Sequence, residues 1–219
     1  MSGLRGFERA VVEWADGGRS APLVSAVGEA LAGDAGPHAV VLVEGMSDQA
    51  AVEALAERRG RSLPDEGVSV VAMGGASSIG HFLDLFGPHG FDIGLAGLCD
   101  AAEEDDFRRN LERAGLGSDL TRTDMERLGF HVCVVDLEDE LIRALGTDAV
   151  EEVIDANGEL RSFRIFQRQP AQRGQDIGAQ LRRFMGTRSG RKIHYGRLLV
   201  EALDLDQVPP PLDRVLAHV

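Results

Sequence analysis

Four short apolar runs, each bounded by turn residues, recur along the first two thirds of the chain. Runs of this length without a polar face are typical of strands buried in a parallel sheet. They predict strands at residues 38–43, 68–73, 91–99 and 129–135. Apolar residues at helical spacing follow each run and predict helices at 47–59 (with Ser47 as N-cap), 77–86, 103–114 and 137–145. This alternation predicts an α/β fold, with a central, mostly parallel four-stranded sheet flanked by helices.

The strand pattern is confined to the middle of the chain, and both flanks are helical. Helical spacing predicts helices at 4–15 and 20–32 before the first strand. After Gly146, helices are predicted at 147–156, 175–186, 194–204 and from 212. We therefore divide the chain into an N-terminal helical segment (1–36), an α/β domain (37–146) and a mainly helical, basic C-terminal extension (147–219).

Charge is unevenly distributed along the chain. Its 219 residues include 36 acidic and 23 basic side chains, for a net charge of −13. Residues 1–158 hold 30 acids against 12 arginines, a net of −18, whereas residues 159–197 hold 10 basic side chains against 2 acids, a net of +8. This bulk charge argues against a protein that coats nucleic acid electrostatically, but not against contact with phosphate through metal ions held on carboxylates. The basic stretch either meets a partner of its own or packs on the acidic body.

The sequence carries no sign of membrane insertion or export. It has no uninterrupted apolar stretch of about 18 residues, and its first 16 residues are charged and lack the apolar region of a signal peptide. Cys99 and Cys133 lie at the ends of apolar runs, so we expect buried free thiols rather than a disulfide or a metal pair. These features favour a cytoplasmic location.

Acidic residues follow three of the four predicted strands. The strand ends carry Glu44 and Asp48, then Asp100 and Glu103, then Asp136 and the acids at 138–140. Ligands of open parallel sheets bind beyond these carboxyl ends. Acids at helix N-termini are also common as solvated side chains, a reading that suits Asp48 and Glu103 better than Glu44 and Asp100, which directly end apolar strands. Because no histidine pair or cysteine set lies nearby, oxygen ligands favour Mg²⁺ or Mn²⁺ over zinc.

Three segments together resemble the metal-binding Toprim domain: VLVEGMSD (41–48), VVAMGG (70–75) and GLCD (97–100). This domain is shared by bacterial primases, topoisomerases, small maturation nucleases and the overcoming-lysogenization-defect (OLD) nucleases. The Glu-Gly-x-Ser-Asp form, the glycine pair and the acidic helix after the fourth strand most resemble the OLD branch. The resemblance covers residues 38–145 and implies a Toprim-like, Rossmann-like fold that holds one or two Mg²⁺ or Mn²⁺ ions.

The resemblance implies roles for residues that match the family by position. Glu44 matches the strand-one glutamate, which serves as a metal ligand or as general acid/base. Asp48 matches the additional acid that OLD nucleases place one helical turn later, on the same face of the site. Asp100 matches the first aspartate of the family's Asp-x-Asp motif. All three are implied metal ligands.

Two later residues complete the implied site. Glu138 matches the acid that OLD nucleases supply after the fourth strand, as a further metal ligand, and Glu140 is the second choice for this position. Lys192, the only lysine of the chain, resembles the late lysine near the scissile phosphate and is implied to be catalytic together with Glu44. A solvent-facing side chain is the alternative reading for this lysine.

One departure from the family pattern concerns the second aspartate of Asp-x-Asp. The chain reads Asp100-Ala101-Ala102-Glu103, with alanine in that position. Glu103 lies one residue later, and its longer side chain can compensate for the backbone shift and act as a metal ligand. Otherwise the second metal is weakened or lost.

The function that the resemblance implies is metal-dependent phosphodiester chemistry on DNA, by a nuclease or by a nucleotidyl transferase or hydrolase. RNA is a further substrate class to test. The alternative, favoured by Ala102, is a catalytically weak or inactive module that binds metal or nucleic acid, or that regulates a partner ATPase. OLD nucleases carry an ATPase domain before Toprim, whereas only about 37 residues precede it here. We therefore expect a standalone Toprim protein or one half of a system with a separately encoded ATPase.

Overall fold

The structure is a computed structural model that describes residues 36–188 and 190–219, together with residues 7, 10, 11, 13, 14, 28 and 29. The predicted helices at 4–15 and 20–32 lie mostly outside the described residues. Four described side chains from this region are buried against the rest of the protein. Among them, Phe7 packs on Phe86 with ring centroids 5.8 Å apart, and the edge of Trp14 meets Phe82 at 5.2 Å.

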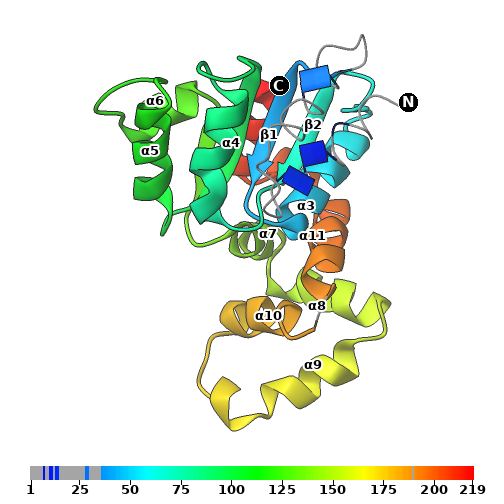
Figure 1. The fold of residues 1–219 in the computed structure, drawn as a ribbon. Coiled ribbons are helices and arrows are strands. Elements are labelled where there is room, and N and C mark those ends of the chain that lie inside the picture. Colours follow the sequence, from blue (N-terminus) through cyan, green and yellow to red (C-terminus); the bar gives the residue numbers. More distant parts are fainter. Residues whose placement is uncertain (1–6, 8–9, 12, 15–27, 30–35, 189) are drawn as a thin grey trace.

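A four-stranded parallel sheet forms the centre of the molecule (Figure 1). Its strands are β1 (Ala39–Val43), β2 (Val68–Ala72), β3 (Gly94–Asp100) and β4 (Phe130–Cys133). The order across the sheet is β2-β1-β3-β4, so β1 and β3 are central neighbours. This confirms the predicted sheet. The predicted third strand began three residues earlier, at Phe91, but the backbone N–H groups of Phe91 and Ile93 donate hydrogen bonds to Leu85 and Phe86 in a turn.

Helices cover both faces of the sheet because the strands alternate between two apolar layers. On β1, Val41 and Val43 face one layer, and Val40 and Leu42 face the other. The first layer contains α3 (Met46–Arg58), α7 (Leu137–Leu145), α11 (Arg191–Ala202) and α12 (Pro210–His218). The second contains α4 (Ile79–Phe86), α5 (Glu104–Arg113) and α6 (Arg122–Arg127).

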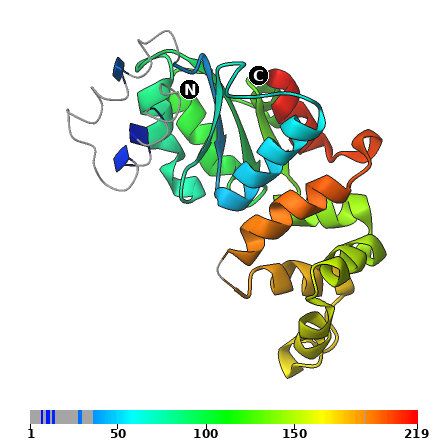
Figure 2. The same ribbon diagram turned by 90° about the vertical axis from the view of Figure 1, so that its right-hand side faces the viewer.

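The remaining helices form a lobe that projects below the sheet in both views (Figures 1 and 2). The lobe consists of α8 (Thr147–Ala156), α9 (Leu160–Gln167) and α10 (Ile177–Met185). Three-residue 3-10 turns occur at Ala76–Ser78, Pro170–Gln172 and Leu205–Gln207. Phe163, Phe166 and Phe184 pack together inside the lobe, with centroid distances from 5.1 to 6.5 Å. The apolar core of the lobe is continuous with the layer under α3 and α11.

Helix α11 returns the chain to the sheet by packing closely on α3. Gly196 makes this approach possible, since a Cβ atom there would lie 2.6 Å from the carbonyl oxygen of Ser47. The helix begins at Arg191, after Gly190 in a left-handed conformation with φ of 77°, rather than at the predicted residue 194. Lys192 therefore lies in the first turn of a helix.

Two helices were not predicted, and the N-cap of α3 was misplaced. Helix α6 is only six residues long and is capped by Thr121, whose hydroxyl accepts a hydrogen bond from the Asp124 N–H. Helix α9 is only eight residues long, and its buried side chains, Phe163 and Phe166, pack on Phe184 of α10. Gly45, not Ser47, is the N-cap of α3.

The described helices include none that is both long enough and apolar enough to cross a membrane. Cys99 and Cys133 are buried free thiols, as expected. They lie on adjacent strands but face opposite apolar layers, which prevents a disulfide between them. Burial raises the pKa of both thiols.

Candidate metal centre

The ends of the two central strands bring the first two carboxylates together. Glu44 follows the last residue of β1, and Asp100 is the last residue of β3, so both lie at the same edge of the sheet. The loop after β2 is held against β1, because the Gly75 N–H donates a hydrogen bond to the Glu44 carbonyl oxygen at 3.1 Å. Gly74 and Gly75 have φ values of 73° and 127°, a backbone conformation that favours glycine.

Glu103 joins these two acids. One carboxylate oxygen from each of Glu44, Asp100 and Glu103 lies within 4.8 Å of the other two. We call these three residues the acidic triad. All three side chains are partly buried, and Glu103 Oε2 has no hydrogen-bond partner within the described part of the chain. A buried carboxylate oxygen without a donor is a position that a cation can fill.

The electrostatics of the acidic triad are those of a site that lacks its counter-charge. Burial, followed by the nearby charges of Glu44 and Asp136, raises the pKa of Asp100 to about 7. Burial, followed by the charge of Glu103, also raises the pKa of Glu44. Carboxylates that repel each other in this way bind a divalent cation favourably once they are ionised. The donor atoms are all carboxylate oxygens, which suits a hard cation such as Mg²⁺ or Mn²⁺.

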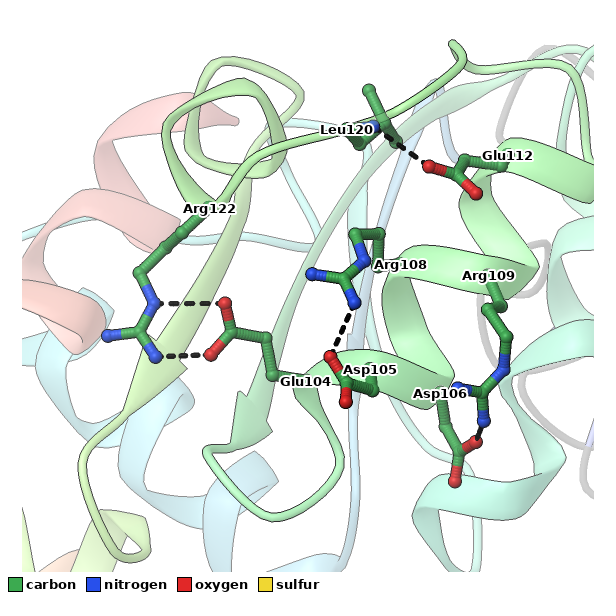
Figure 3. Close-up of polar contacts among 8 residues, drawn as sticks. All are labelled: Glu104, Asp105, Asp106, Arg108, Arg109, Glu112, Leu120 and Arg122. Carbon is green, nitrogen blue, oxygen red and sulfur yellow. Dashed lines mark hydrogen bonds and ion pairs between the residues drawn. The ribbon is translucent and has the colours of Figure 1, made fainter.

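The other acids at the start of α5 are paired with arginines (Figure 3). Each forms an ion pair with an arginine: Glu104 with Arg122, Asp105 with Arg108, and Asp106 with Arg109. These pairs neutralise the acids at the surface, and they leave Glu103 as the acid of this segment that faces Asp100 and Glu44.

Asp48 and Glu138 lie beside the triad. Asp48 Oδ2 accepts a hydrogen bond from the Gly45 N–H at 2.9 Å, which caps α3 and fixes the loop that carries Glu44. Burial, followed by the charge of Glu138, raises the pKa of Asp48 to about 6. The Glu138 side chain is only 3% exposed, and its Oε2 lies 3.1 Å from the Nζ atom of Lys192.

Glu140, the second choice for the late acidic ligand, is engaged elsewhere. Its Oε1 accepts a hydrogen bond from the Val134 N–H at 2.8 Å, and its Oε2 lies 2.7 Å from Arg143 Nη2. Both oxygens of Glu140 therefore stabilise the segment that connects β4 to α7. Glu138, in contrast, faces Lys192 and contributes to the raised pKa values of Glu44 and Asp48.

Comparison with known proteins identifies the segment that carries two acids of the triad, Glu44 and Asp100. Residues 38–101 match the family described as overcoming lysogenization defect protein-like, TOPRIM domain. This segment is an OLD-like Toprim domain. Toprim domains bind divalent metal ions, and the match indicates a metal-dependent function connected with nucleic acids. No curated protein sequence matches the chain.

Solved structures extend the likeness beyond the Toprim domain. The C-terminal region of the OLD protein of Xanthomonas campestris pv. campestris, phased with platinum, is 24% identical, with a TM-score of 0.64 over 84% of this chain and 92% of that one. The same region phased with mercury is 25% identical, with a TM-score of 0.60 over 83% and 94%. The C-terminal region of the Burkholderia pseudomallei OLD protein is 20% identical, with a TM-score of 0.63 over 83% and 96%. The shared fold therefore includes most of the C-terminal helices.

The departure from Asp-x-Asp in this Toprim domain has a clear geometric outcome. Ala102 is exposed, whereas the Glu103 carboxylate reaches the ends of β1 and β3. The Glu103 N–H donates a hydrogen bond to the Asp100 carbonyl oxygen at 3.0 Å, which closes a turn between the two acids. The extra residue is accommodated in this turn, and the longer glutamate side chain spans the remaining distance.

Two residues of the Toprim site region were not among the predicted site residues. Asp136 is the N-cap of α7, three residues after β4, which ends at Cys133 rather than at the predicted residue 135. It contributes to the raised pKa of Asp100. Its Oδ1 accepts a hydrogen bond from the Asp139 N–H at 2.8 Å, and its Oδ2 lies 3.4 Å from Nη1 of Arg182. The sequence signal for Asp136 was its position directly after an apolar run. Arg182, 46 residues later on α10, has no short-range signal in the sequence.

The start of α11 is held firmly beside the Toprim domain. Arg191 is 7% exposed, and it pairs with Glu159 at 2.8 Å and lies over the Phe184 ring at 4.2 Å. The Tyr195 hydroxyl donates a hydrogen bond to the same carboxylate at 3.0 Å. This network fixes the turn that presents Lys192. Burial alone would lower the pKa of Lys192, but the carboxylate of Glu138 outweighs it and raises the pKa, so the ammonium stays charged.

Proposed function

We propose that this chain cleaves phosphodiester bonds in DNA in a reaction that depends on Mg²⁺ or Mn²⁺. The observation that supports this most strongly is the acidic triad, three carboxylate oxygens within 4.8 Å of one another at the carboxyl edge of an OLD-like Toprim domain. The unpartnered oxygen of Glu103 and the raised pKa of Asp100 are the features expected of a site built around a cation.

The residues divide into two groups by their surroundings. Glu44, Asp100 and Glu103 would hold one cation, and Asp48 and Glu138, on the side of Glu44 toward Lys192, are the proposed ligands of a second. When bound, divalent cations supply Lewis-acid stabilisation of the phosphate oxygens and activation of water.

Glu44 and Lys192 are the proposed catalytic residues. Burial and the neighbouring acids raise the pKa of Glu44, which favours a role for this carboxyl group in accepting or returning a proton. The Lys192 ammonium is half exposed on the side of Glu138, so it can approach a phosphate bound at the centre. Its positive charge would stabilise the additional negative charge of the transition state.

The test is nicking of supercoiled plasmid by the full chain, with Mg²⁺ or Mn²⁺ and with EDTA. We expect metal-dependent nicking that falls by at least about 100-fold in E44Q and in D100N, because each change removes a charged ligand from the triad. D105N is the matched control, since Asp105 is paired with Arg108 on the surface. Wild-type protein that cleaves neither plasmid nor structured RNA with any divalent metal would contradict the proposal.

The second candidate is a Toprim module with little or no catalysis, which binds metal or nucleic acid or regulates a separately encoded ATPase. Ala102 favours it, because the triad lacks the second aspartate that the Toprim pattern contains. Tight Mn²⁺ binding that needs Glu44 and Asp100, without cleavage or nucleotidyl transfer, would support this candidate over the first.

A further inference from the structure

A cavity of about 480 Å³ opens beside the acidic triad, between the start of α7, helix α10 and the start of α11. It shares two residues with the candidate metal centre, Asp136 and Lys192. Its lining consists of Asp136, Gln172, Gln175, Ala179, Arg182, Arg183 and Lys192. The cavity is therefore continuous with the proposed catalytic region, but most of its lining comes from the helical lobe.

The lining carries an excess of positive charge in a protein whose net charge is −13. Arg182, Arg183 and Lys192 face the single carboxylate of Asp136. The contact of Arg182 with Asp136 is long, at 3.4 Å. Arg183 is exposed and makes no ion pair with any residue that the structure describes. Lys192 is paired with Glu138 at 3.1 Å, so Arg183, together with the loosely paired Arg182, is the charge available to an anion from outside the chain.

The wall of the cavity is a structured element. Gln180 Nε2 donates hydrogen bonds to the carbonyl oxygens of Gln172 and Gln175, each at 3.0 Å, and Asp176 caps α10 by accepting the Ala179 N–H at 2.9 Å. Gln172 is 2% exposed, yet its Oε1 has no hydrogen-bond partner among the described residues. This buried amide oxygen needs a donor, which water can supply, because a phosphodiester offers only acceptors.

We propose that this cavity binds a phosphate of the nucleic-acid strand next to the phosphate at the metal centre. Guanidinium groups match phosphate oxygens in bidentate geometry, and the NH2 groups of glutamine side chains can donate hydrogen bonds to a phosphate. Lys192 stands between the two phosphate positions, since it lines the cavity and also contacts Glu138. This inference rests on the proposed function, and it assigns substrate positioning to Arg182 and Arg183.

The test is binding of a fluorescein-labelled 12-nucleotide oligodeoxythymidylate to the full chain, by anisotropy, with Ca²⁺ in place of the catalytic metal. We expect the R182A/R183A variant to bind at least about tenfold more weakly, and R183A alone about threefold more weakly. Loss of the phosphate that the two arginines hold together should also reduce the slope of log affinity against log salt by about 0.7, the contribution of one neutralised phosphate of a single strand.

The matched control is R109A/R127A, which removes the same charge from exposed arginines of α5 and α6 on the opposite layer of the sheet. It should change binding by less than twofold. The inference would be overturned if R182A/R183A bound the oligonucleotide with the same affinity and the same salt dependence as this control. Mn²⁺ affinity, measured by electron paramagnetic resonance, shows whether the double variant disturbs the metal centre through Asp136. If it does, R183A decides the question, because Arg183 has no ion pair to lose within the described chain.

The two proposals fail in different ways. Wild-type protein that nicks plasmid, with R182A/R183A binding like the control, would overturn the phosphate cavity and leave the nuclease proposal intact. Wild-type protein that binds the oligonucleotide through the arginine pair but never cleaves would overturn the nuclease proposal alone.

Discussion

The backbone N–H of Glu103 donates a hydrogen bond to the carbonyl oxygen of Asp100, and this turn returns the Glu103 carboxylate to within 4.8 Å of the Asp100 carboxylate. The residue between them that matches the second aspartate of Asp-x-Asp is Ala102, which points into solvent-exposed space. The third carboxylate of the triad is therefore supplied one position later in the chain than the family pattern places it.

Replacement of Glu103 should weaken metal binding, and an aspartate at 102 should not restore it. We expect E103A to lower Mn²⁺ affinity by about tenfold or more, because it removes one of three charged ligands. A102D/E103A should bind no better than E103A, since position 102 is exposed. Isothermal titration with Mn²⁺ measures both. Full recovery in the double variant would show that the aspartate of the family pattern can still reach the centre.

Metal affinity should rise with pH between about pH 6 and pH 8. The pKa values of Asp48 and Asp100 are raised to about 6 and about 7, so these carboxyl groups hold protons that a cation must displace. Release of one proton corresponds to roughly a tenfold gain in affinity per pH unit below the pKa. Mn²⁺ titrations at pH 6, 7 and 8 test this expectation. An affinity independent of pH would contradict the protonated state of Asp100.

The stability of the metal-free protein should have the opposite pH dependence. A carboxyl group whose pKa is raised on folding binds more protons in the folded state, so its contribution is present below the unfolded pKa of about 4 and is lost as pH rises to about 7. We expect the Tm in EDTA to fall between pH 5 and pH 7.5, and the rise in Tm on adding Mn²⁺ to be larger at pH 7.5. D48N/D100N should flatten both trends.

Removal of the Lys192 charge should reduce cleavage much more than it reduces the stability of the fold. K192M leaves Glu138, only 3% exposed, without its cation, and should cost about 1–3 kcal/mol in the free energy of unfolding. If Lys192 acts on the transition state, cleavage should fall by about 100-fold or more. Mn²⁺ affinity should stay the same or increase, because a positive charge near the ligands is lost. Unchanged cleavage by K192M would return Lys192 to the role of a neutralising partner of Glu138.

An alanine at position 196 should disturb the packing of α11 on α3. The added Cβ would lie 2.6 Å from the Ser47 carbonyl oxygen, so we expect a loss of about 1–3 kcal/mol in the free energy of unfolding by urea. G186A is the matched control, because its Cβ would meet only the Arg183 carbonyl oxygen, at 3.6 Å. Equal stability of the two variants would show that α11 and α3 can move apart without cost.

The sheet was predictable because each strand is a short apolar run flanked by turns, and all four runs formed strands. Two short helices were not predicted: α6 depends on a local cap at Thr121, and α9 on the packing of its phenylalanines against α10. The predicted start of α11 missed the first turn because the apolar pattern begins later than the conformational break at Gly190.

The site was predictable where it depends on strand ends. Glu44 and Asp100 end neighbouring strands, and the sequence also indicated that Glu103 could replace the missing aspartate, which agrees with the triad. The choice between Glu138 and Glu140 needed the structure, because one helical turn carries both and their partners, Lys192 and Val134, decide which way each faces. Arg182 reaches Asp136 only through the packing of α10 on α7.

Lys192 can join the candidate metal centre only after α11 has been synthesised and has packed on α3. During synthesis, the strands that carry the acidic triad emerge from the ribosome about 90 residues before Lys192. A chain arrested before Gly190 would contain every proposed metal ligand but neither the lysine nor the helix that presents it. Such a fragment could capture a cation early and gain metal-dependent rigidity, while the proposed chemistry would wait for the completed C-terminal helices.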